Sequence, residues 1–483
     1  ASDVYKRQVF VPFYSRSMVY TMPEFLERRY NPQSRTILSV ISLVSYVLTK
    51  VAVTVYAGGL VFQQVFGIKE LWGIDFFWIA AIGLVVLTAL YTIFGGMKSV
   101  LYTSVLQTPI LLLGSLIILV LGFKELGGWD EMMRVCGAVT VNDYGDTMTN
   151  LIRSNDDANF PWLGALIGSA IIGFWYWCTD QFIVQRVLSG KNEKEARRGT
   201  IFGAYLKLLP VFLFLIPGMI AFALHQKYIG AGGEGFLPML ANGTANADAA
   251  FPTLVAKLLP AGVKGLVVCG ILAALMSSLA SLFNSSAMLF TIDFYKRFRP
   301  ETPEKKLVGI GQIATVVIVI LGILWIPIMR SVGDVLYTYL QDVQSVLAPG
   351  IAAAFLLGIC WKRTSAQGGM WGLIAGMIIG LTRLGAKVYY SNAGEVADST
   401  FKYLFYDMNW LFFCGWMFLF CIIVVIVVSL ATEAPTAEKI QGLVFGTATK
   451  EQKAATRASW DHWDIIHTVI ILAITGAFYW YFW

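Results

Sequence analysis

Aromatic and polar side chains interrupt four apolar stretches of the sequence, and the first of these reads WYWCTDQ at positions 175–181. Neighbouring side chains point in different directions round a helix, so the three rings cannot all face lipid. The face of Tyr176 can stack on the apolar C–H face of a sugar ring while its hydroxyl bonds elsewhere. The other interpretation is an interfacial aromatic anchor near the end of the stretch.

A lysine lies inside the second of these stretches. Lys207 is one helical turn from the end of its stretch and close to Pro210. It can extend its ammonium group to the membrane surface along its aliphatic stem. If it points inward instead, its three hydrogen-bond donors suit the oxygen atoms of a hydroxylated ligand. The sequence leaves both interpretations open.

The third stretch is rich in small hydroxylated residues and reads ALMSSLASLFNSS at positions 274–286. The carbonyl of Ala274 and the hydroxyls of Ser277 and Ser278 lie within one helical turn. A hard cation such as Na⁺ takes oxygen ligands, so these groups are candidate sodium ligands that need a partner helix for the rest. The alternative is structural, because small residues allow close helix packing and serine hydroxyls bond to carbonyls one turn earlier.

The fourth stretch carries polar residues ahead of a Pro-Gly pair. The polar residues are Tyr337, Gln341, Asp342, Gln344 and Ser345. Gln341 and Ser345 are four residues apart and share a helix face. Pro349-Gly350 predicts a bend or break near midspan that frees backbone carbonyls. Interrupted helices with polar groups point to a transporter binding site, and no selectivity-filter segment is visible that would favour a channel.

The composition places these stretches in a membrane. Of the 483 residues, 57% are hydrophobic and 14% are charged, and the mean hydropathy is +0.67. Soluble domains carry about 25% charged residues, so a water-soluble enzyme is excluded. The sequence also lacks the GxxxxGK(S/T), HExxH and GxSxG patterns, which disfavours an ATP-driven pump and an intramembrane hydrolase.

Eleven apolar runs are long enough to cross about 30 Å of hydrocarbon as helices. They are 37–66, 72–94, 100–122, 161–188, 200–227, 262–291, 308–329, 334–361, 366–388, 408–431 and 463–483. The formal net charge is +6, and Lys and Arg gather before the first run and near 186–199, 293–307 and 362–363, whereas 123–160 is acidic. Because positive charge marks the cytoplasmic side, the chain is expected to start inside and end outside.

Five segments in order resemble the sodium–solute symporter family, in its sodium/glucose cotransporter branch, as a bacterial-type member. The segments are YTMPEFLERRY (20–30), WYWCTDQFIVQR (175–186), YLKLLP (205–210), ALMSSLASLFNSS (274–286) and LAPGIAAAFLLGICWKR (347–363). The tryptophan-flanked CTDQ segment is typical of the sugar and inositol branch. The likeness runs from about Val9 to Trp483.

The resemblance implies an all-α membrane protein with the five-plus-five inverted-repeat (LeuT-type) transporter fold. Such proteins have fourteen spans, so eleven spans imply that the first three of fourteen are missing and that this chain does not transport alone. Residues 1–36 are then the end of a missing span plus a cytoplasmic segment, and 37–361 are the remaining eight core helices. Residues 362–483 are three peripheral helices, with a cytoplasmic loop near 432–462.

The resemblance also assigns roles to residues of this chain. Tyr176 matches an aromatic residue that stacks on the sugar and forms the inner gate, braced by Trp175 and Trp177. Tyr337 matches an outer-gate aromatic residue. Lys207 and Gln341 match sugar-binding positions, and Trp177 is counted with them. Ala274, Ser277 and Ser278 match one helix's share of the main sodium site.

Three positions depart from the pattern of the family. Gly173 stands where relatives carry a polar residue that faces the sugar, so one hydrogen bond is expected to be lost at this substrate-site position. Ser104 replaces an aspartate, and Ala280 replaces a hydroxyl that relatives coupling two sodium ions can carry. These departures predict one Na⁺ per solute.

The resemblance therefore predicts a symporter that uses Na⁺ as its coupling ion to import a hexose such as glucose or galactose. The expected partners are a sugar, Na⁺ and the lipid bilayer, with no nucleic acid, no further cofactor and no enzymatic activity. The expected location is the plasma (inner) membrane, which the chain crosses many times. The alternatives are a sodium symporter for myo-inositol, sialic acid or another polyol, and an uncoupled sugar uniporter or sensor.

Overall fold

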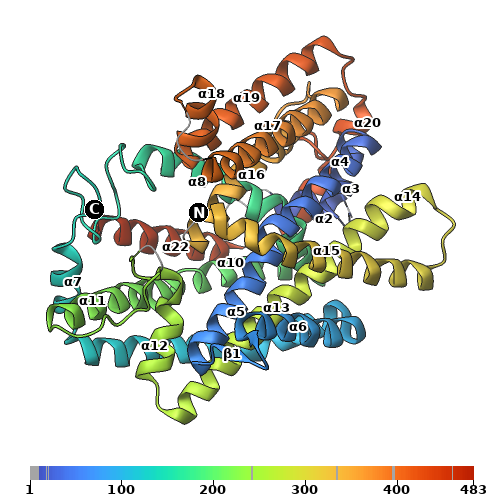
Figure 1. Cartoon of the computed structure of the whole chain (residues 1–483). Coiled ribbons are helices and arrows are strands. Elements are labelled where there is room, and N and C mark those ends of the chain that lie inside the picture. Colours follow the sequence, from blue (N-terminus) through green and yellow to red (C-terminus); the bar gives the residue numbers. More distant parts are fainter. Residues whose placement is uncertain are drawn as a thin grey trace. The chain divides into compact units, whose positions relative to one another are not determined.

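The computed structural model describes residues 10–17, 19, 21–240, 243–332, 335–393, 397–459 and 461–482. These residues are almost entirely helical (Figure 1). Two short strands, β1 (Glu70–Leu71) and β2 (Ile74–Asp75), form an antiparallel hairpin between two helices. The expected all-α architecture is therefore observed.

Ten helices within the described residues are long and apolar enough to cross a membrane, and a shorter apolar helix covers Phe76–Leu90. The ten are Pro32–Phe66, Gln107–Leu126, Trp162–Thr179, Glu193–Gly230, Ala261–Phe298, Glu304–Met329, Leu336–Cys360, Ala366–Asn392, Trp410–Ala431 and His462–Tyr481. Among the described residues, ten of the eleven expected spans thus have a counterpart of spanning length, and the run 72–94 has only the shorter helix. The second and third expected spans lie on one uninterrupted helix, α6 (Phe76–Leu126), which at 1.5 Å per residue is roughly 77 Å long.

The chain divides into two compact units. The first comprises Ala1–Thr49, Arg153–Tyr205 and Ser285–Tyr481, and the second comprises Lys50–Ile152, Leu206–Asn284 and Phe482–Trp483. The helices that belong chiefly to the first unit are α2 (Val11–Ser17), α3 (Met22–Arg29), α4 (Pro32–Ser45), α8 (Trp162–Phe174), α9 (Gln181–Leu188), α10 (Glu193–Leu206), α14 (Lys296–Phe298), α15 (Glu304–Val332), α16 (Leu336–Cys360), α17 (Ala366–Asn392), α18 (Thr400–Lys402), α19 (Trp410–Ala431), α20 (Ala437–Ile440), α21 (Lys450–Ala458) and α22 (His462–Tyr481). Those of the second are α5 (Ala52–Phe66), α6, α7 (Trp129–Gly137), η5 (Ala247–Ala249), α11 (Ile216–Gly230), α12 (Ala250–Leu258) and α13 (Ala261–Met288).

Local sequence signals set several helix ends. The side chains of Thr21, Asn31 and Ser365 each accept a hydrogen bond from a first-turn amide of α3, α4 and α17, respectively. Such capping satisfies amides that have no partner within the helix. At the other end of α5, Gly67 takes a left-handed conformation with φ +66°, which glycine adopts without steric cost.

Wide helical turns occur in several helices, including three of the four that the sequence singled out. These π-helical segments are η2 (Tyr46–Val51), η3 (Trp175–Thr179), η4 (Val211–Leu215), η6 (Leu289–Tyr295) and η7 (Tyr403–Asp407). Single π-turns inside helices are frequent at functional sites. Here η3 follows α8, η4 follows a two-residue turn after α10, and η6 continues α13.

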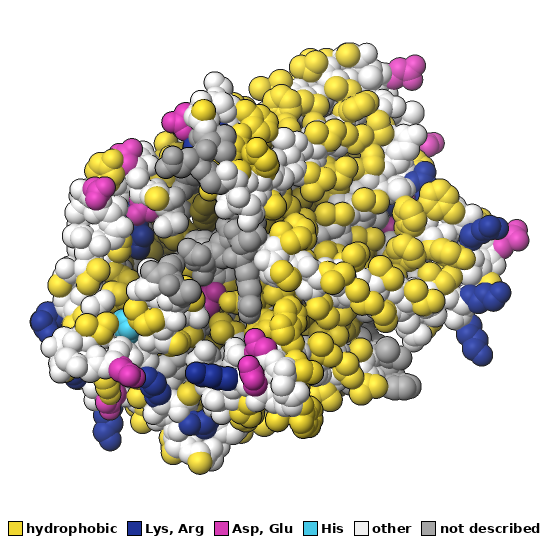
Figure 2. Space-filling view, viewed as in Figure 1, with side chains coloured by type: hydrophobic (Ala, Val, Ile, Leu, Met, Phe, Trp, Pro, Cys, Tyr) yellow, Lys and Arg dark blue, Asp and Glu magenta, His cyan; other side chains and the backbone are white. Residues whose placement is uncertain are grey.

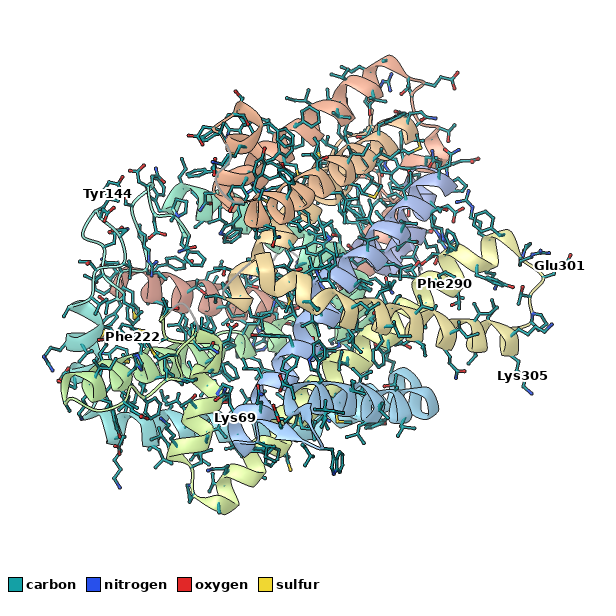
Figure 3. All side chains as sticks on the ribbon, in the orientation of Figure 1. Lys69, Tyr144, Phe222, Phe290, Glu301 and Lys305 are labelled. Carbon is teal, nitrogen blue, oxygen red and sulfur yellow. The ribbon has the colours of Figure 1, made fainter. Side chains whose placement is uncertain are left out.

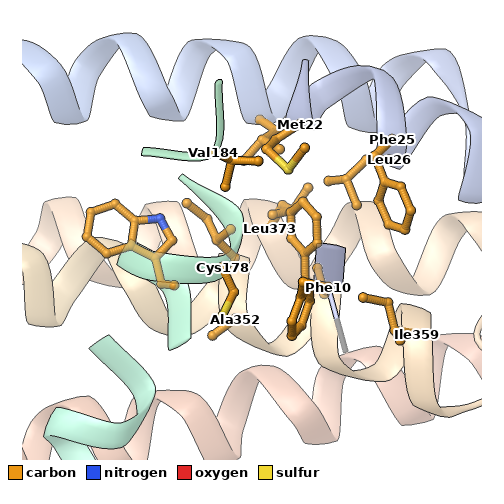
Figure 4. Packing of buried hydrophobic residues seen from close by; sticks show 14 of the residues in the cluster. Phe10, Met22, Phe25, Leu26, Cys178, Val184, Ala352, Ile359 and Leu373 are labelled. Carbon is orange, nitrogen blue, oxygen red and sulfur yellow. The ribbon is translucent and has the colours of Figure 1, made fainter. Parts of the chain in front are cut away.

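The core of the first unit forms where α3 packs against α16 (Figure 4). The rings of Phe25 and Phe355 are stacked with centroids 5.8 Å apart. The Tyr30 hydroxyl donates to the carbonyl of Ala354 (2.7 Å), and Nε of Arg29 donates to the carbonyl of Gly358 (2.7 Å). The YTMPEFLERRY segment, whose role the sequence left unassigned, is thus a support for α16.

The core of the second unit is a separate apolar cluster. Its buried residues come from α6, α7, α11, α12 and α13 and include Ile118, Met132, Leu224, Leu254 and Val267. Their complete burial shows that α11 and α12, with the loop between them, pack on α6 and α7. This cluster supports the helix α13, which carries the serine-rich turn.

The sequence predicted a bend or break at Pro349-Gly350, and the break is not observed, because α16 continues through Pro349 from Leu336 to Cys360. The reason lies in the neighbouring helix α17. A Cβ atom built on Gly376 would lie 2.6 Å from the Cα atom of Gly350, so the two backbones are in direct contact. Close packing of small residues of this kind holds membrane helices together and keeps α16 intact across the proline.

Apolar side chains cover most of the visible surface, and charged side chains lie mainly towards its edges (Figure 2). Exposed leucine, isoleucine, valine and aromatic residues occur along α6, α15, α19 and α22. The basic loop expected near 293–307 includes the turn between α14 and α15, from which Glu301 projects, and the first turn of α15, from which Lys305 projects (Figure 3). This distribution is that of a protein with lipid-facing helices and polar loops.

We expect Gly376→Ala to destabilise the first unit, because its methyl group would meet the backbone of Gly350 at 2.6 Å. Overpacking of this kind costs about 1–3 kcal/mol. Thermal unfolding of the detergent-solubilised protein measures the effect. Gly385→Ala on the same helix is the control, since a Cβ atom there meets nothing within 4 Å. Equal unfolding temperatures for the two variants would contradict the contact.

Candidate functional site

The fourth span is interrupted at Asp180, directly after the predicted aromatic residues. Helix α8 continues as η3, Asp180 is extended (φ −77°, ψ 123°), and α9 then begins at Gln181. The Asp180 carboxylate accepts a hydrogen bond from the amide of Phe182 (3.1 Å) and so caps α9. The break therefore has a local cause in the sequence, a capping residue in the middle of an apolar stretch.

Side chains from the start of the chain hold this break. The Tyr46 hydroxyl donates to Oδ1 of Asp180 (3.0 Å) and accepts from the amide of Phe182 (3.0 Å). The amide of Met22 donates to Oε1 of Gln181 (2.9 Å), and the Tyr14 hydroxyl donates to the carbonyl of Cys178. The polar groups of the CTDQ segment are thus engaged in supporting the backbone.

The three aromatic residues before the break differ in their exposure. Trp175 is buried, whereas Tyr176 and Trp177 are half-buried, and the last two rings meet edge to face with centroids 4.8 Å apart. Gly173 lies one residue before the end of α8 and is also half-buried. The ring of Trp175 lies 6.1 Å from that of Tyr176, and its bracing role stays a prediction.

Helix α16 packs against η3 and carries the remaining candidates of the first unit. Gln341 is half-buried and forms a hydrogen bond with the exposed Tyr337 one turn earlier. The ring of Tyr337 lies 6.5 Å from that of Phe160. Ser345, expected to share the face of Gln341, is fully buried and donates to the carbonyl of Asp342 (2.6 Å). Its hydroxyl thus serves the helix itself.

The second unit carries the serine-rich turn. Ser277 is buried, Ala274 and Ser278 are half-buried, and all three lie on α13. The hydroxyl oxygen of Ser277 lies 2.6 Å from that of Ser104 on α6. The two helices pack closely in this region. A Cβ atom on Gly270 of α13 would lie only 3.0 Å from the side chain of Ile110 on α6. The departure noted at Ser104 is therefore part of the same polar site.

Lys207 lies at an interruption of its own span. Helix α10 ends at Leu206, Lys207 and Leu208 form a turn, and η4 follows Pro210. The side chain of Lys207 is half-buried. The structure thus places Gly173, Trp175, Tyr176, Trp177, Tyr337 and Gln341 in the first unit, and Lys207, Ala274, Ser277 and Ser278 in the second.

The chain is similar to known proteins over most of its length. The profile of the Sodium:solute symporter family matches residues 4–376. The sodium/mannose cotransporter of Bos taurus is 36% identical, over 98% of this chain and 82% of the relative. The human sodium/myo-inositol cotransporter 2 is 35% identical over 91% of this chain, and the sodium/glucose cotransporter 1 of Ovis aries is 37% identical over 88%. This chain spans 66% of each of these last two.

One solved structure supports the fold. A Na⁺-coupled sialic acid symporter in a substrate-bound outward-open state matches with a TM-score of 0.65, at 21% identity, over 89% of this chain and 81% of that one. The match confirms the expected symporter fold class. At this level of identity it shows the fold alone.

We expect Tyr46→Phe to destabilise the break at Asp180, because the carboxylate loses a hydroxyl donor and the Phe182 amide loses an acceptor. Loss of a hydrogen bond to a charged group costs about 1.5–3 kcal/mol. The thermal unfolding midpoint in detergent reports the loss. Tyr479→Phe on the exposed side of α22 should leave the midpoint unchanged. If both variants behave alike, Tyr46 does not hold the break.

Proposed function

Because this chain belongs to the sodium:solute symporter family, we propose that it is a sodium-coupled symporter that imports a hexose by alternating access across the plasma (inner) membrane. The observation that carries the proposal is the polar turn of α13, where the hydroxyls of Ser277 and Ser104 lie 2.6 Å apart within apolar helices. Polar groups at membrane depth are costly and mark ion and substrate pathways.

We assign the sodium ligands to the α13 turn. The carbonyl of Ala274 and the hydroxyls of Ser277 and Ser278 are neutral oxygens, which suit a hard cation. Ser104 adds a fourth oxygen beside Ser277. No carboxylate belongs to this set, so the site favours a metal cation over a titrating proton, and one Na⁺ per solute remains our expectation.

The solute-binding residues are the half-buried aromatic and polar side chains at the interrupted spans. Tyr176 stacks on the sugar ring and closes the inner side, with Trp175 and Trp177 bracing it, and Tyr337 closes the outer side. Lys207 and Gln341 donate hydrogen bonds to sugar hydroxyls. The remaining position, Gly173, leaves space where a polar side chain would add a hydrogen bond.

Coupling follows from differential binding. If Na⁺ binds more tightly to the conformation that also binds the solute, each ligand raises the affinity for the other by the same factor. The sodium gradient then drives solute uptake. In this proposal the interrupted spans at Asp180 and Lys207 supply backbone that can rearrange without breaking a continuous helix.

Two other substrate classes compete with a hexose. Myo-inositol is favoured by the likeness to the human sodium/myo-inositol cotransporter 2, at 35% identity. Sialic acid carries a carboxylate, which Lys207 would pair with. From a different functional class, an uncoupled uniporter or sensor would bind the same sugars without Na⁺.

Uptake by the full-length protein in proteoliposomes tests the proposal. Radiolabelled glucose, galactose, mannose, myo-inositol and sialic acid are offered with an inward Na⁺ gradient and with choline in its place. We expect uptake of a hexose only with Na⁺. Equal uptake in choline would establish a uniporter, and uptake of inositol or sialic acid alone would replace the hexose as substrate.

We expect Ser278→Ala to raise the Na⁺ concentration for half-maximal uptake by about tenfold to a hundredfold, because a bond to a charged group contributes about 1.5–3 kcal/mol. The solute concentration for half-maximal uptake at saturating Na⁺ should change little. Cys269→Ala, at an exposed position of the same helix, is the control. Unchanged sodium dependence in Ser278→Ala would remove Ser278 from the site.

A further inference from the structure

A buried ion cluster lies on the helix that carries Gln341. Asp342 of α16 forms an ion pair with Lys387 of α17, and Nη2 of Arg383 lies 3.9 Å from its other carboxylate oxygen. The side chain of Arg383 is completely buried, and that of Lys387 is only one-fifth exposed. One carboxylate thus faces two cations in an apolar setting, where an unpaired charge is strongly disfavoured.

Arg383 is fixed independently of Asp342. Its guanidinium donates to the carbonyls of Leu404 (3.2 Å) and Met408 (2.6 Å), at the segment that joins η7 to α19. It also lies 4.0 Å from the ring centroid of Phe413 on α19. The cationic side of the cluster is therefore part of a rigid frame built from α17, η7 and α19, and Asp342 attaches α16 to this frame.

A second contact holds the same face of α16. The Tyr339 hydroxyl donates to the carbonyl of Leu48 (3.0 Å) and accepts from Nε1 of Trp325 (2.6 Å). Tyr339 and Asp342 are three residues apart and so project from one side of the helix. Gln341 lies about 200° round the helix from Tyr339, at 100° per residue. Gln341 and Tyr337 therefore project from the side of the helix opposite to Tyr339, and Gln341 lies about 100° round the helix from Asp342.

We propose that the Asp342–Lys387 pair is a positioning pair, which sets the rotation of the first turns of α16 and thereby directs Gln341 toward the solute. The inference rests on the proposed function, since it deepens the role given to Gln341. Apolar contacts alone would permit α16 to repack in a slightly rotated register. The ion pair forbids this, because rotation would separate the carboxylate from both buried cations.

A double-mutant cycle in the full-length protein separates positioning from stability. The variants are Asp342→Asn, Lys387→Met and the combination of both, assayed by uptake of labelled glucose, mannose and myo-inositol into proteoliposomes and by thermal unfolding. Asp342→Asn leaves Lys387 and Arg383 without their carboxylate, and Lys387→Met leaves that carboxylate only Arg383, at 3.9 Å, so we expect a lower unfolding midpoint for both. We also expect an increase of about tenfold or more in the solute concentration for half-maximal uptake, with the sodium concentration for half-maximal uptake changed less than about twofold.

The double variant gives the decisive result. It removes both charges of the ion pair and leaves Arg383 held by the carbonyls of Leu404 and Met408 and by the ring of Phe413, so the unfolding midpoint should lie closer to that of the wild type than in Asp342→Asn. The solute concentration for half-maximal uptake should stay raised, because the restraint on rotation is still absent. If the unfolding midpoint and the solute concentration for half-maximal uptake both recover in the double variant, the proposal is overturned and the pair is a purely structural contact. Equal shifts in the sodium and solute concentrations for half-maximal uptake would lead to the same conclusion.

A matched control comes from another Asp–Lys pair of the same unit. Asp398→Asn breaks the Asp398–Lys402 ion pair (2.8 Å), whose carboxylate is 96% exposed. We expect no change in either quantity, because exposed ion pairs contribute little. Absence of sodium-dependent uptake by the wild type would overturn the proposed function, and the positioning role with it. Sodium-dependent uptake that Asp342→Asn leaves unaltered would overturn the positioning role alone.

Discussion

The hydrogen bonds between Tyr46 and the Asp180–Phe182 turn are the interaction on which the candidate site depends. An extended residue inside an apolar helical stretch exposes backbone groups that lipid cannot satisfy. Here the Asp180 carboxylate caps the following helix, and the Tyr46 hydroxyl bonds to both the carboxylate and the amide of Phe182. With the break fixed in this way, Trp175 is buried while Tyr176 and Trp177 remain partly accessible.

The frame behind that break is built from small residues and buried polar anchors. Gly376 of α17 contacts the backbone of Gly350 on α16, and a Cβ atom on Gly372 would meet Val425 of α19 at 2.4 Å. Apolar burial alone cannot drive such contacts in lipid, so close packing and hydrogen bonds hold the helices together. Arg383 of α17 donates to the carbonyls of Leu404 and Met408 and lies over the ring of Phe413 on α19. It therefore links α17 to η7 and α19 at a second position.

Interrupted and continuous helices have different roles in this chain. The spans that contain Asp180 and Lys207 are interrupted, and each places a half-buried candidate residue at the interruption. By contrast α16 stays continuous through Pro349 and presents Gln341 on a face opposite to Tyr339. The serine-rich turn of α13 is helical as well, and Ser104 reaches it from α6. At Asp180 the irregular backbone is supported by hydrogen bonds from other segments.

The sequence by itself determined the class of the protein and the identity of its polar residues. Long apolar runs require membrane helices, and rare polar residues such as Ser277 and Gln341 stand out against them. The family likeness carried by five short segments gave the fold and the candidate roles. Short-range capping signals, such as Thr21 and Asn31 before prolines, were also readable, because they act within one helical turn.

Only the tertiary structure decided which polar groups are engaged in holding the fold. The sequence assigned no role to Asp180 and Gln181, whose partners Tyr46 and Met22 lie more than 130 positions away. Pro349 predicted a bend or break, yet α16 continues through it beside Gly376 of the next helix. Asp342 was grouped with Gln341 among the polar residues of the fourth stretch, yet its carboxylate faces Lys387 and Arg383. In each case the outcome depends on a contact between distant segments, which local propensity and spacing do not encode.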